Sequence, residues 1–348
     1  MTRPLDDYLT LEKRIARLIA RGGSAEPEFN EAALAVHRFQ RTHNAPFERY
    51  CRHLGVPPEI ADWRTIPAVP QSAFKRFALR AFPTEQTART FRTSGTTGEG
   101  FGEHHFRSLR LYDAAILRGW DGLALPRITF LILTPTPEAA PRSSLAYMMG
   151  VLARERGGPA SEFIVESDGR IDLERFRAAM AAQQAVGLLG TALAFLNLFE
   201  RLGPDRAALP DGSFALETGG YKGSGRDITK AALYAQFATH VGLPPDRVLN
   251  EYGMTELSSQ CYTRGLGAPH IAPPWMRALV IDPETNREVA VGETGVLRVF
   301  DLANLGSALA IQTQDIAVRH ERGFELLGRD PAALPRGCSR TADERMRA

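Results

Sequence analysis

The 348-residue sequence has few lysines, few cysteines and almost no net charge. Its formal charge of +2 at pH 7 gives no electrostatic reason to expect nucleic acid or a membrane surface as a partner. The three cysteines are widely spaced and include no C-x-x-C pair, which argues against a zinc site and against a disulfide framework. No apolar run is long enough to span a membrane, and the N-terminus lacks the apolar segment of a secretion signal. These absences predict a cytoplasmic protein with reduced thiols.

What is present is the composition of an ordinary globular protein, with 44% apolar and 24% charged residues. The length allows two domains, or one large α/β core with a small appendage. Three parts are expected: a helical N-terminal segment over residues 1–60, an α/β core over 61–275, and a small β subdomain with a C-terminal tail over 276–348. Within the helical segment, Asn30 is a candidate N-cap of the second helix.

Strand and helix patterns alternate through the expected core. The continuous apolar run 128–133 is typical of a buried parallel strand. Further strands are predicted at 162–165, 186–189, 214–216 and 247–249. Helices are predicted at 108–123, 143–156, 171–183, 193–202 and 226–240. This order predicts an α/β fold with mostly parallel sheets and flanking helices. Beyond residue 275, short strands are predicted at 277–281, 287–291, 295–300 and 324–327, with a turn at 282–286.

A run of hydroxyl side chains and glycines follows Arg92. Glycines let backbone N–H groups approach a ligand closely, and hydroxyls add uncharged donors, so the run predicts a loop that binds an oligophosphate. A Walker-type loop requires Lys and then Ser or Thr after its second glycine, whereas Phe101 and Gly102 follow Gly100 here. A polar surface loop is the alternative. The candidate phosphate-binding residues are Thr93, Ser94, Gly95, Thr96, Thr97 and Gly98.

This run resembles the phosphate loop of the adenylate-forming superfamily, which includes acyl-CoA synthetases, luciferases and nonribosomal adenylation domains. Downstream, the segment from Glu251 through Tyr252 and Gly253 to Thr255 and Glu256 resembles the superfamily's Tyr-Gly-x-Thr-Glu element. The resemblance implies that ATP is a substrate, that Tyr252 stacks near adenine, that Thr255 reaches a phosphate and that Glu256 holds Mg²⁺. Mg²⁺ favours one or two carboxylates together with phosphate oxygens. A strand-end turn is the alternative for this segment taken alone.

Two further residues resemble ribose-contacting positions of the superfamily. Asp315 stands where a carboxylate accepts hydrogen bonds from both ribose hydroxyls, and Arg329 follows a glycine as the superfamily's arginine does. The usual element has Arg or Lys, then Thr and Gly, before the aspartate. In this chain Gln312, Thr313 and Gln314 stand in these three positions.

The segment around Gly219 and Gly220 resembles the turn that lines the adenine pocket. Such a turn brings the backbone close to a flat base, and Tyr221 offers a stacking face. Lys222 either neutralises charge that develops on the phosphates or is a surface lysine.

Contacts with the acid are expected from two places. The pair His104-His105 has no third metal ligand nearby in the sequence, so His105 is either a contact to the acid or a structural histidine. Gly190 and Thr191 either form a wall of the acid pocket or begin a helix.

The tail from Gly328 to Ser339, together with residues 66–70 and 74–75, resembles the LuxE-type acyl-protein synthetases. That family implies a fatty acid that is activated with ATP, moved to a cysteine and passed to a reductase. Cys338 matches the acceptor, and Arg336 and Arg340 beside it favour a thiolate nucleophile. An idle thiol in the tail is the alternative.

Most members of the superfamily carry a mobile C-terminal domain of about a hundred residues, a normal domain size, which supplies a lysine for adenylation. This sequence stops twenty residues after Gly328, so that domain and its lysine are expected to be absent.

The expected function is therefore the formation of an acyl-adenylate, with Thr255, Glu256, Lys222 and Cys338 as candidate catalytic residues, followed by transfer of the acyl group to Cys338 and then to a reductase. One alternative keeps adenylation but loads CoA, a carrier protein or an amine. A second alternative is a nucleotide-binding subunit without catalysis.

Overall fold

The structure is a computed structural model, which describes residues 4–23, 25–93, 100–166, 169–204, 206, 208–219, 228–329 and 346. The chain forms two compact units. The first unit comprises residues 1–119, 254–260 and 271–348, and the second comprises 120–253 and 261–270. Both are interrupted in sequence, so the N-terminal helices and the C-terminal strands fold together in the first unit. The three-part division predicted from the sequence order stays a prediction.

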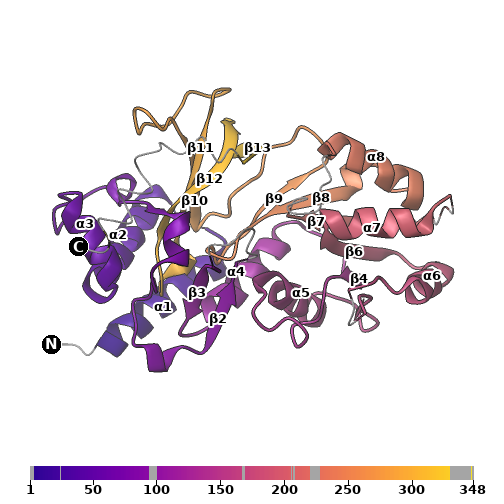
Figure 1. Ribbon diagram of the computed structural model, residues 1–348, viewed down its shortest axis with the longest axis horizontal. Helices are drawn as coiled ribbons and strands as arrows, with labels where there is room; N and C mark the ends of the chain where they lie inside the picture. The colour runs from indigo at the N-terminus through magenta and orange to yellow at the C-terminus, as the bar shows by residue number, and fades with distance from the viewer. Residues whose placement is uncertain are drawn as a thin grey trace. The chain divides into compact units, whose positions relative to one another are not determined.

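The first unit combines three N-terminal helices with a five-stranded sheet (Figure 1). The helices are α1 (Pro4–Arg21), α2 (Glu26–His43) and α3 (Ala45–His53). The strands run in the order β1 (Val69–Pro70), β12 (Ala310–Arg319), β11 (Thr294–Asp301) and β10 (Met276–Ile281), and β13 (Phe324–Arg329) pairs with β12. Only β1 is parallel to its neighbour. A hairpin of β2 (Arg89–Arg92) and β3 (Glu103–Phe106) and the helix α4 (Arg110–Asp121) follow.

Short 3₁₀ turns connect these elements. They are η1 (Trp63–Thr65), η2 (Gln71–Lys75), η3 (Thr84–Gln86) and η5 (Leu302–Asn304) in the first unit, and η4 (Pro245–Arg247) in the second. η2 and η5 matter most, because each contributes a side chain that holds the candidate site.

The second unit contains a six-stranded sheet in the order β5-β4-β6-β7-β8-β9. The first five strands are parallel and β9 is antiparallel to β8. Their bounds are β4 (Thr129–Leu133), β5 (Glu162–Phe163), β6 (Val186–Thr191), β7 (Phe214–Thr218), β8 (Val248–Tyr252) and β9 (Cys261–Arg264). The helices are α5 (Ser144–Glu155), α6 (Leu173–Ala181), α7 (Ala192–Leu202) and α8 (Lys230–Val241).

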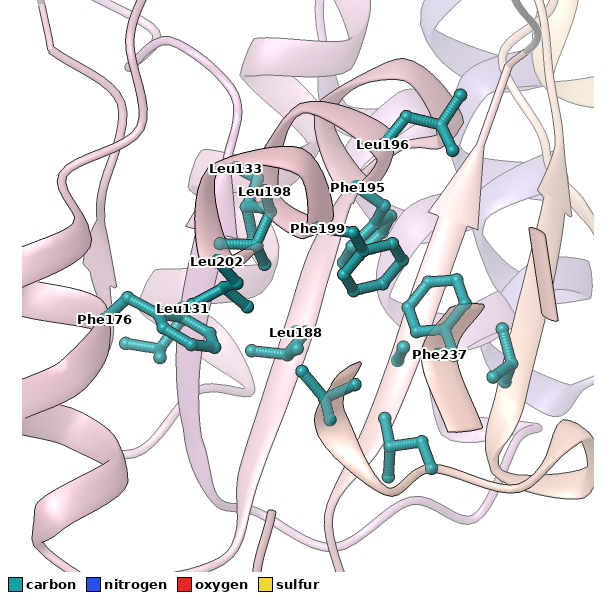
Figure 2. Packing of buried hydrophobic residues seen from close by; sticks show 14 of the residues in the cluster. Leu131, Leu133, Phe176, Leu188, Phe195, Leu196, Leu198, Phe199, Leu202 and Phe237 are labelled. Carbon is teal, nitrogen blue, oxygen red and sulfur yellow. The ribbon is translucent and has the colours of Figure 1, made fainter. Parts of the chain in front are cut away.

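The main core of the second unit lies on one face of this sheet. Alternate residues of β4 and β6, such as Leu131 and Leu188, pack against α6, α7 and α8. Figure 2 shows Phe195, Phe199 and Phe237 gathered in this cluster, and the centroids of Phe195 and Phe237 are 4.7 Å apart. The α/β class and the mostly parallel core sheet predicted from the sequence are confirmed.

Two local predictions are wrong. Asn30 lies inside α2, which begins four residues earlier with a proline in its first turn, where a missing N–H costs nothing. Its side chain instead accepts from the Trp63 backbone N–H at 2.8 Å. Residues 287–291 form no strand: a single bridge joins Glu288 to Ile281, and Gly292, with φ of 88°, turns the chain toward β11.

Candidate active site

The ends of the predicted phosphate loop are closed by paired backbone and side-chain hydrogen bonds in the first unit. The Thr93 N–H donates to the carbonyl of Gly102 at 2.9 Å, and the Gly102 N–H donates to Thr93 Oγ1 at 2.8 Å. A Cβ at Gly102 would lie 3.0 Å from Thr93 Cγ2, so the closure favours glycine. Ser94, Gly95, Thr96, Thr97 and Gly98 lie outside the described residues. We call the Arg92–Thr93 and Gly102 pairing the loop neck.

Thr255 lies beside the loop neck. Its Oγ1 is 3.4 Å from the carbonyl oxygen of Arg92 and donates to it. This is a long hydrogen bond, so the hydroxyl can turn to a better acceptor at small cost. The structure thus brings together two motifs that the sequence separates by more than 150 residues.

Glu256, the next residue, has a buried carboxylate that is 4% exposed. Its Oε1 accepts from Gln71 Nε2 at 3.1 Å. Burial raises the pKa of this carboxyl and the charge of Asp315 adds to the rise, while the Gln71 hydrogen bond and the charge of Arg329 oppose it. Gln71 is on η2, between the family-like segments 66–70 and 74–75, but no pattern in the sequence marks the glutamine itself as a partner of Glu256. The oxygen of the same amide, Gln71 Oε1, is buried and has no hydrogen-bond partner among the described residues.

Asp315 and Arg329 face each other across β12 and β13. Arg329 Nε donates to Asp315 Oδ1, and Asp315 is almost fully buried. The residues just before Asp315 have structural partners: Thr313 Oγ1 donates to the carbonyl of Leu297 at 2.7 Å. Gln312 accepts from Arg298 Nε at 2.8 Å. These residues therefore fix β12 against β11 and leave Asp315 positioned beside Arg329.

His104, which follows the loop neck by two residues in the sequence, forms a hydrogen bond with the backbone of Thr255. Its Nδ1 is 2.8 Å from the carbonyl oxygen of Thr255, and its Nε2 is 2.9 Å from Ser307 Oγ. Because a carbonyl can only accept, Nδ1 carries the proton and Nε2 accepts from the serine hydroxyl. Burial lowers the pKa of His104 to about 3, so the ring is neutral.

A second line of hydrogen bonds reaches the same segment from α2. Asn304 Nδ2 donates to the carbonyl of Glu256 at 2.9 Å. The Asn304 carbonyl accepts from Gln40 Nε2 at 2.8 Å, and Gln40 Oε1 accepts from the Leu309 N–H at 3.0 Å. Gln40 and Asn304 are both buried, so the network is satisfied away from water. The N-terminal helices are thereby part of the site's support.

In the second unit, polar residues gather where β7 and β8 end. Thr218 Oγ1 donates to Glu251 Oε2, and the Tyr234 hydroxyl donates to Glu217 Oε1 at 3.2 Å. Burial raises the pKa of both Glu217 and Glu251 to about 7. The Glu251 carboxylate therefore faces a hydroxyl of its own unit.

Some of the residues predicted to line the adenine pocket lie outside the described residues. Gly219 has a positive φ of 70°, as a turn after β7 requires. Tyr252 is buried, with its ring centroid 6.2 Å from that of His270. Gly253, which follows it, is exposed. Gly220, Tyr221 and Lys222 lie outside the described residues. The nucleotide contacts of this segment stay predictions.

A cavity of about 240 Å³ opens in the second unit near the carboxyl ends of β4 and β6. Thr191 lines it, while Gly190 packs against the strand, because a Cβ there would lie 2.9 Å from Leu133 Cβ. The cavity is lined by Leu133, Thr134, Pro135, Ala140, Ser143, Leu145, Ala146, Val165, Gly169, Ile171, Thr191, Leu193, Ala194 and Asn197.

His105 belongs to the first unit, where its Nδ1 is 3.0 Å from Thr90 Oγ1. It lines a cavity of about 10 Å³, which has room for roughly one water molecule. Burial lowers the pKa of His105, and the charge of Arg80 adds to this. A contact of His105 with the acid stays a prediction.

Two of the three cysteines lie within the described residues. Cys51 and Cys261 are buried, and burial raises the pKa of Cys51 to about 12, so Cys51 is not a reactive thiolate. Cys338 lies outside the described residues. Among the residues that the structure describes, no group of three or more His, Cys, Asp or Glu side chains could hold a metal ion by itself. No helix within the same residues is long and apolar enough to cross a membrane.

Comparison with known proteins confirms the resemblance to LuxE-type ligases. The chain is 24% identical over 299 residues to the long-chain-fatty-acid–luciferin-component ligase of Aliivibrio fischeri, covering 81% of this chain and 77% of that protein. It is 21% identical over 327 residues to the ligase of the same name from Vibrio harveyi, covering 87% of this chain and 84% of that protein. No protein-family model matches the chain.

Solved structures share the fold. An open conformation of 2-hydroxyisobutyryl-CoA ligase in complex with 2-HIB-AMP and CoA superposes with a TM-score of 0.66 and 13% identity over 89% of this chain and 76% of that one. ATP-bound MatB from Rhodopseudomonas palustris gives a TM-score of 0.52 and 21% identity over 73% of this chain. The chain spans half the length of that MatB structure. The fold is therefore that of adenylate-forming enzymes, as predicted, and the chain is related to ligases.

Proposed function

We propose that this chain, which is similar to luciferin-component ligases over most of its length and has the fold of adenylate-forming enzymes, activates a carboxylic acid with ATP. A carboxylate oxygen of the acid attacks the α-phosphorus of ATP and forms a new P–O bond. The bond between the α-phosphorus and the oxygen that bridges to the β-phosphate breaks, and pyrophosphate leaves with that electron pair. The product is an acyl-adenylate. That a solved structure of the same fold contains ATP supports ATP as the co-substrate.

The observation that carries this proposal is the meeting of three distant chain segments in the first unit. Thr255 Oγ1 lies 3.4 Å from the backbone of the loop neck, and Glu256 follows it. The charges of Asp315 and Arg329 both act on the Glu256 carboxyl, so this pair lies close to it. The residues proposed to bind phosphate, metal and ribose therefore lie close to one another, which supports the proposal.

Glu256 and Gln71 fit a magnesium ion by the chemistry of their oxygens. Glu256 offers a carboxylate, and the partnerless Gln71 Oε1 is a second hard oxygen beside it. Mg²⁺ held there together with phosphate oxygens would neutralise the negative charge of the triphosphate. Thr255 donates its hydroxyl to a phosphate oxygen, and Asp315 accepts from the ribose hydroxyls while Arg329 holds it in place.

The second step moves the acyl group to a thiol. Cys338 attacks the acyl carbon as thiolate, a thioester forms, and AMP leaves with the electron pair of the broken C–O bond. Cys338 is nine positions after Arg329 in the sequence, so the covalent chain limits their Cα distance to about 30 Å. Beyond Cys338, Met346 is buried and its carbonyl accepts from Arg49 Nε at 2.6 Å, so both ends of this segment are anchored on the first unit. A reductase then takes the acyl group in this proposal.

A second candidate uses CoA, a carrier protein or an amine in place of Cys338. It is supported by the CoA in the complex of 2-hydroxyisobutyryl-CoA ligase, which has the same fold. A subunit that binds nucleotide without catalysis is a third, and the intact Thr255 and Glu256 argue against it.

The test is acid-dependent release of pyrophosphate and AMP by the full chain with ATP, Mg²⁺ and a panel of carboxylic acids, with hydroxylamine added to trap the acyl-adenylate as a hydroxamate. We expect Glu256→Gln to lower the rate by about a hundredfold, because it removes a charge that acts on the transition state. The exposed Glu321→Gln is the matched control and should keep the wild-type rate. An unchanged rate in Glu256→Gln would refute the assignment of Glu256, and no acid-dependent release with any acid would refute the function.

A further inference from the structure

We infer that Arg92 binds the terminal phosphates of ATP, and the pyrophosphate that they become, and that Glu103 holds the Arg92 guanidinium while no phosphate is bound. The inference rests on the proposed function, because it adds a residue to the site that activates the acid. All the residues that carry it belong to the first unit, which also contains Thr255 and Glu256.

Arg92 is the last residue of β2 and stands directly before the predicted phosphate loop (Figure 1). Its backbone carbonyl accepts from the Thr255 hydroxyl at 3.4 Å, and the next residue, Thr93, closes the loop neck with Gly102. A phosphate that takes the Thr255 hydroxyl therefore lies beside the residue whose side chain carries a guanidinium. The planar fork of a guanidinium presents paired N–H donors that match the oxygens of a phosphate.

The contact between Arg92 and Glu103 uses only part of the guanidinium. The two residues stand directly opposite each other on β2 and β3, and Arg92 Nε donates to Glu103 Oε1 at 2.8 Å. Among the described residues, the two terminal nitrogens of Arg92 form no hydrogen bond. A partly exposed ion pair of this kind is weak, whereas guanidinium–phosphate hydrogen bonds are charge-assisted and can be bidentate. A phosphate is therefore a stronger partner for Arg92 than Glu103 is.

An aromatic ring beside the guanidinium remains available when that partner changes. Phe101 is 56% exposed, and Arg92 Cζ lies 6.0 Å from its ring centroid. The face of an aromatic ring attracts a cation without using the N–H donors of the cation. Phe101 can therefore keep the guanidinium at the loop neck while its N–H groups turn from a carboxylate to a phosphate.

Glu103 can give up Arg92 at small cost. Its Oε2 lies 3.7 Å from His105 Nε2, and its side chain is 36% exposed, so water also reaches it. His105 Nδ1 lies 3.0 Å from Thr90 Oγ1, which holds the ring beside Glu103. The large penalty for leaving a buried charge without a partner therefore does not apply to this carboxylate.

The proposed reaction creates a charge that Arg92 would meet. When the bond to the α-phosphorus breaks, the bridging oxygen keeps the electron pair and pyrophosphate carries the added charge. Arg329 is paired with Asp315 at the ribose end, so it does not serve the leaving group. A fixed cation beside the leaving group stabilises the transition state. AMP has no terminal phosphates, and its binding is therefore expected not to depend on Arg92.

Calorimetric binding by the full chain, without any acid, tests the inference independently of turnover. Arg92→Gln should weaken the binding of MgATP and of magnesium pyrophosphate by about ten- to a hundredfold and leave the binding of AMP unchanged. Arg92→Lys, which keeps the charge but not the fork, should lose less. Arg319→Gln is the matched control, because Arg319 forms an ion pair of similar exposure with Glu288, at 3.0 Å, in the same unit.

The three ligands separate the possible failures. Equal weakening of ATP and AMP binding in Arg92→Gln, or no weakening of either, would overturn the inference and leave the proposed function standing. A wild-type chain that binds none of the three ligands would refute the proposed function, and the inference with it.

Glu103→Gln tests the exchange of partners. It should tighten the binding of MgATP by about two- to fivefold, because no carboxylate then competes for the guanidinium. In an Arg92→Gln background the same change should have no effect. A gain of equal size in both backgrounds would show that Glu103 acts on the phosphates by repulsion alone and would overturn its role as the holder of Arg92. Glu288→Gln is the matched control and should leave the binding unchanged.

Discussion

The Nδ1 atom of His104 lies 2.8 Å from the carbonyl oxygen of Thr255, and its other nitrogen lies 2.9 Å from Ser307 Oγ. The ring packs between Phe74 and Phe106, with centroids at 5.7 and 4.1 Å. A neutral imidazole in this environment is both a donor and an acceptor in fixed directions. His104 therefore acts as a positioning residue, which fixes the backbone that presents Thr255 and Glu256.

The first prediction follows from that geometry. His104→Phe keeps a ring of similar size but removes the donor to Thr255, so we expect kcat for adenylate formation to fall by about ten- to a hundredfold with a smaller change in the KM for ATP. The lost bond should also lower the free energy of unfolding by about 1–3 kcal/mol. His104→Asn, which can still donate to a carbonyl, should recover part of the rate.

The exposed His53→Phe is the matched control for this variant. Because burial lowers the pKa of His104 to about 3, the wild-type rate should show no titration of this ring above pH 5. A folded His104→Phe protein with the wild-type kcat would contradict the positioning role.

The second prediction concerns Gln71 and the pH dependence of the rate. The Gln71 hydrogen bond opposes the burial that raises the pKa of Glu256, so removing it in Gln71→Met should raise that pKa further. The proposed role needs the ionised carboxylate, and therefore the acid side of the pH–rate profile should move to higher pH. The profile of kcat/KM against pH measures this shift.

Gln184→Met, at an exposed position, is the control for a change from amide to thioether. If the acid side of the Gln71→Met profile coincides with that of the wild type, Gln71 does not tune Glu256.

The sequence predicted the elements that carry a local pattern and missed those that depend on contacts between residues far apart in the chain. The strands β4, β6 and β7 carry continuous apolar runs, and each was predicted because burial on both faces leaves a local signal. β12 was missed, since Gln312, Thr313 and Gln314 interrupt its apolar pattern. Thr313 is nevertheless fully buried, and its hydroxyl is paired with Leu297 on the neighbouring strand. Only the tertiary structure supplies that partner.

The same distinction applies to the candidate site. Thr93, Thr255 and Asp315 stand in short motifs that can be recognised one at a time. Gln71 is 185 residues from Glu256, and Gln40 lies 264 residues from Asn304. A glutamine on a short turn or on a helix carries no pattern that points to a carboxylate so far along the chain. These supporting residues become visible only when the first unit is folded.

The third prediction concerns Cys338 and separates the two acyl acceptors. If Cys338 is the acceptor, incubation with ATP, Mg²⁺ and a competent acid should add an acyl mass that is released by hydroxylamine and maps to Cys338. Cys338→Ala should abolish the added mass while acid-dependent pyrophosphate release in the presence of hydroxylamine continues. The reason is that adenylation precedes thiol attack and does not need it.

Cys261→Ala is the matched control, because that thiol is buried in the second unit and should not be acylated. An acyl increment that persists in Cys338→Ala, or a wild-type protein that forms the adenylate but gains no mass, would assign the acceptor to CoA, a carrier protein or an amine.

The fourth prediction is a loss of stability as the pH rises, caused by the buried carboxyl of Glu251. Its pKa is raised from 4.5 to about 7 by burial, so between these values the folded protein binds more protons than the unfolded chain. Stability must then fall as the pH rises through this window, by up to about 3 kcal/mol for this group. Glu217, whose pKa burial also raises to about 7, contributes with the same sign, and the two groups are linked because the charge of Glu251 adds to the rise at Glu217.

Glu251→Gln removes the titrating group and keeps an oxygen that can accept from Thr218. We therefore expect a smaller difference in unfolding free energy between pH 5 and pH 8 than in the wild type, measured by urea unfolding at both values. Glu138→Gln, at an exposed position, should retain the wild-type difference. Equal pH dependence in Glu251→Gln and the wild type would mean that the Glu251 carboxyl is not protonated in the folded protein at pH 5, since only a proton bound on folding can produce the slope.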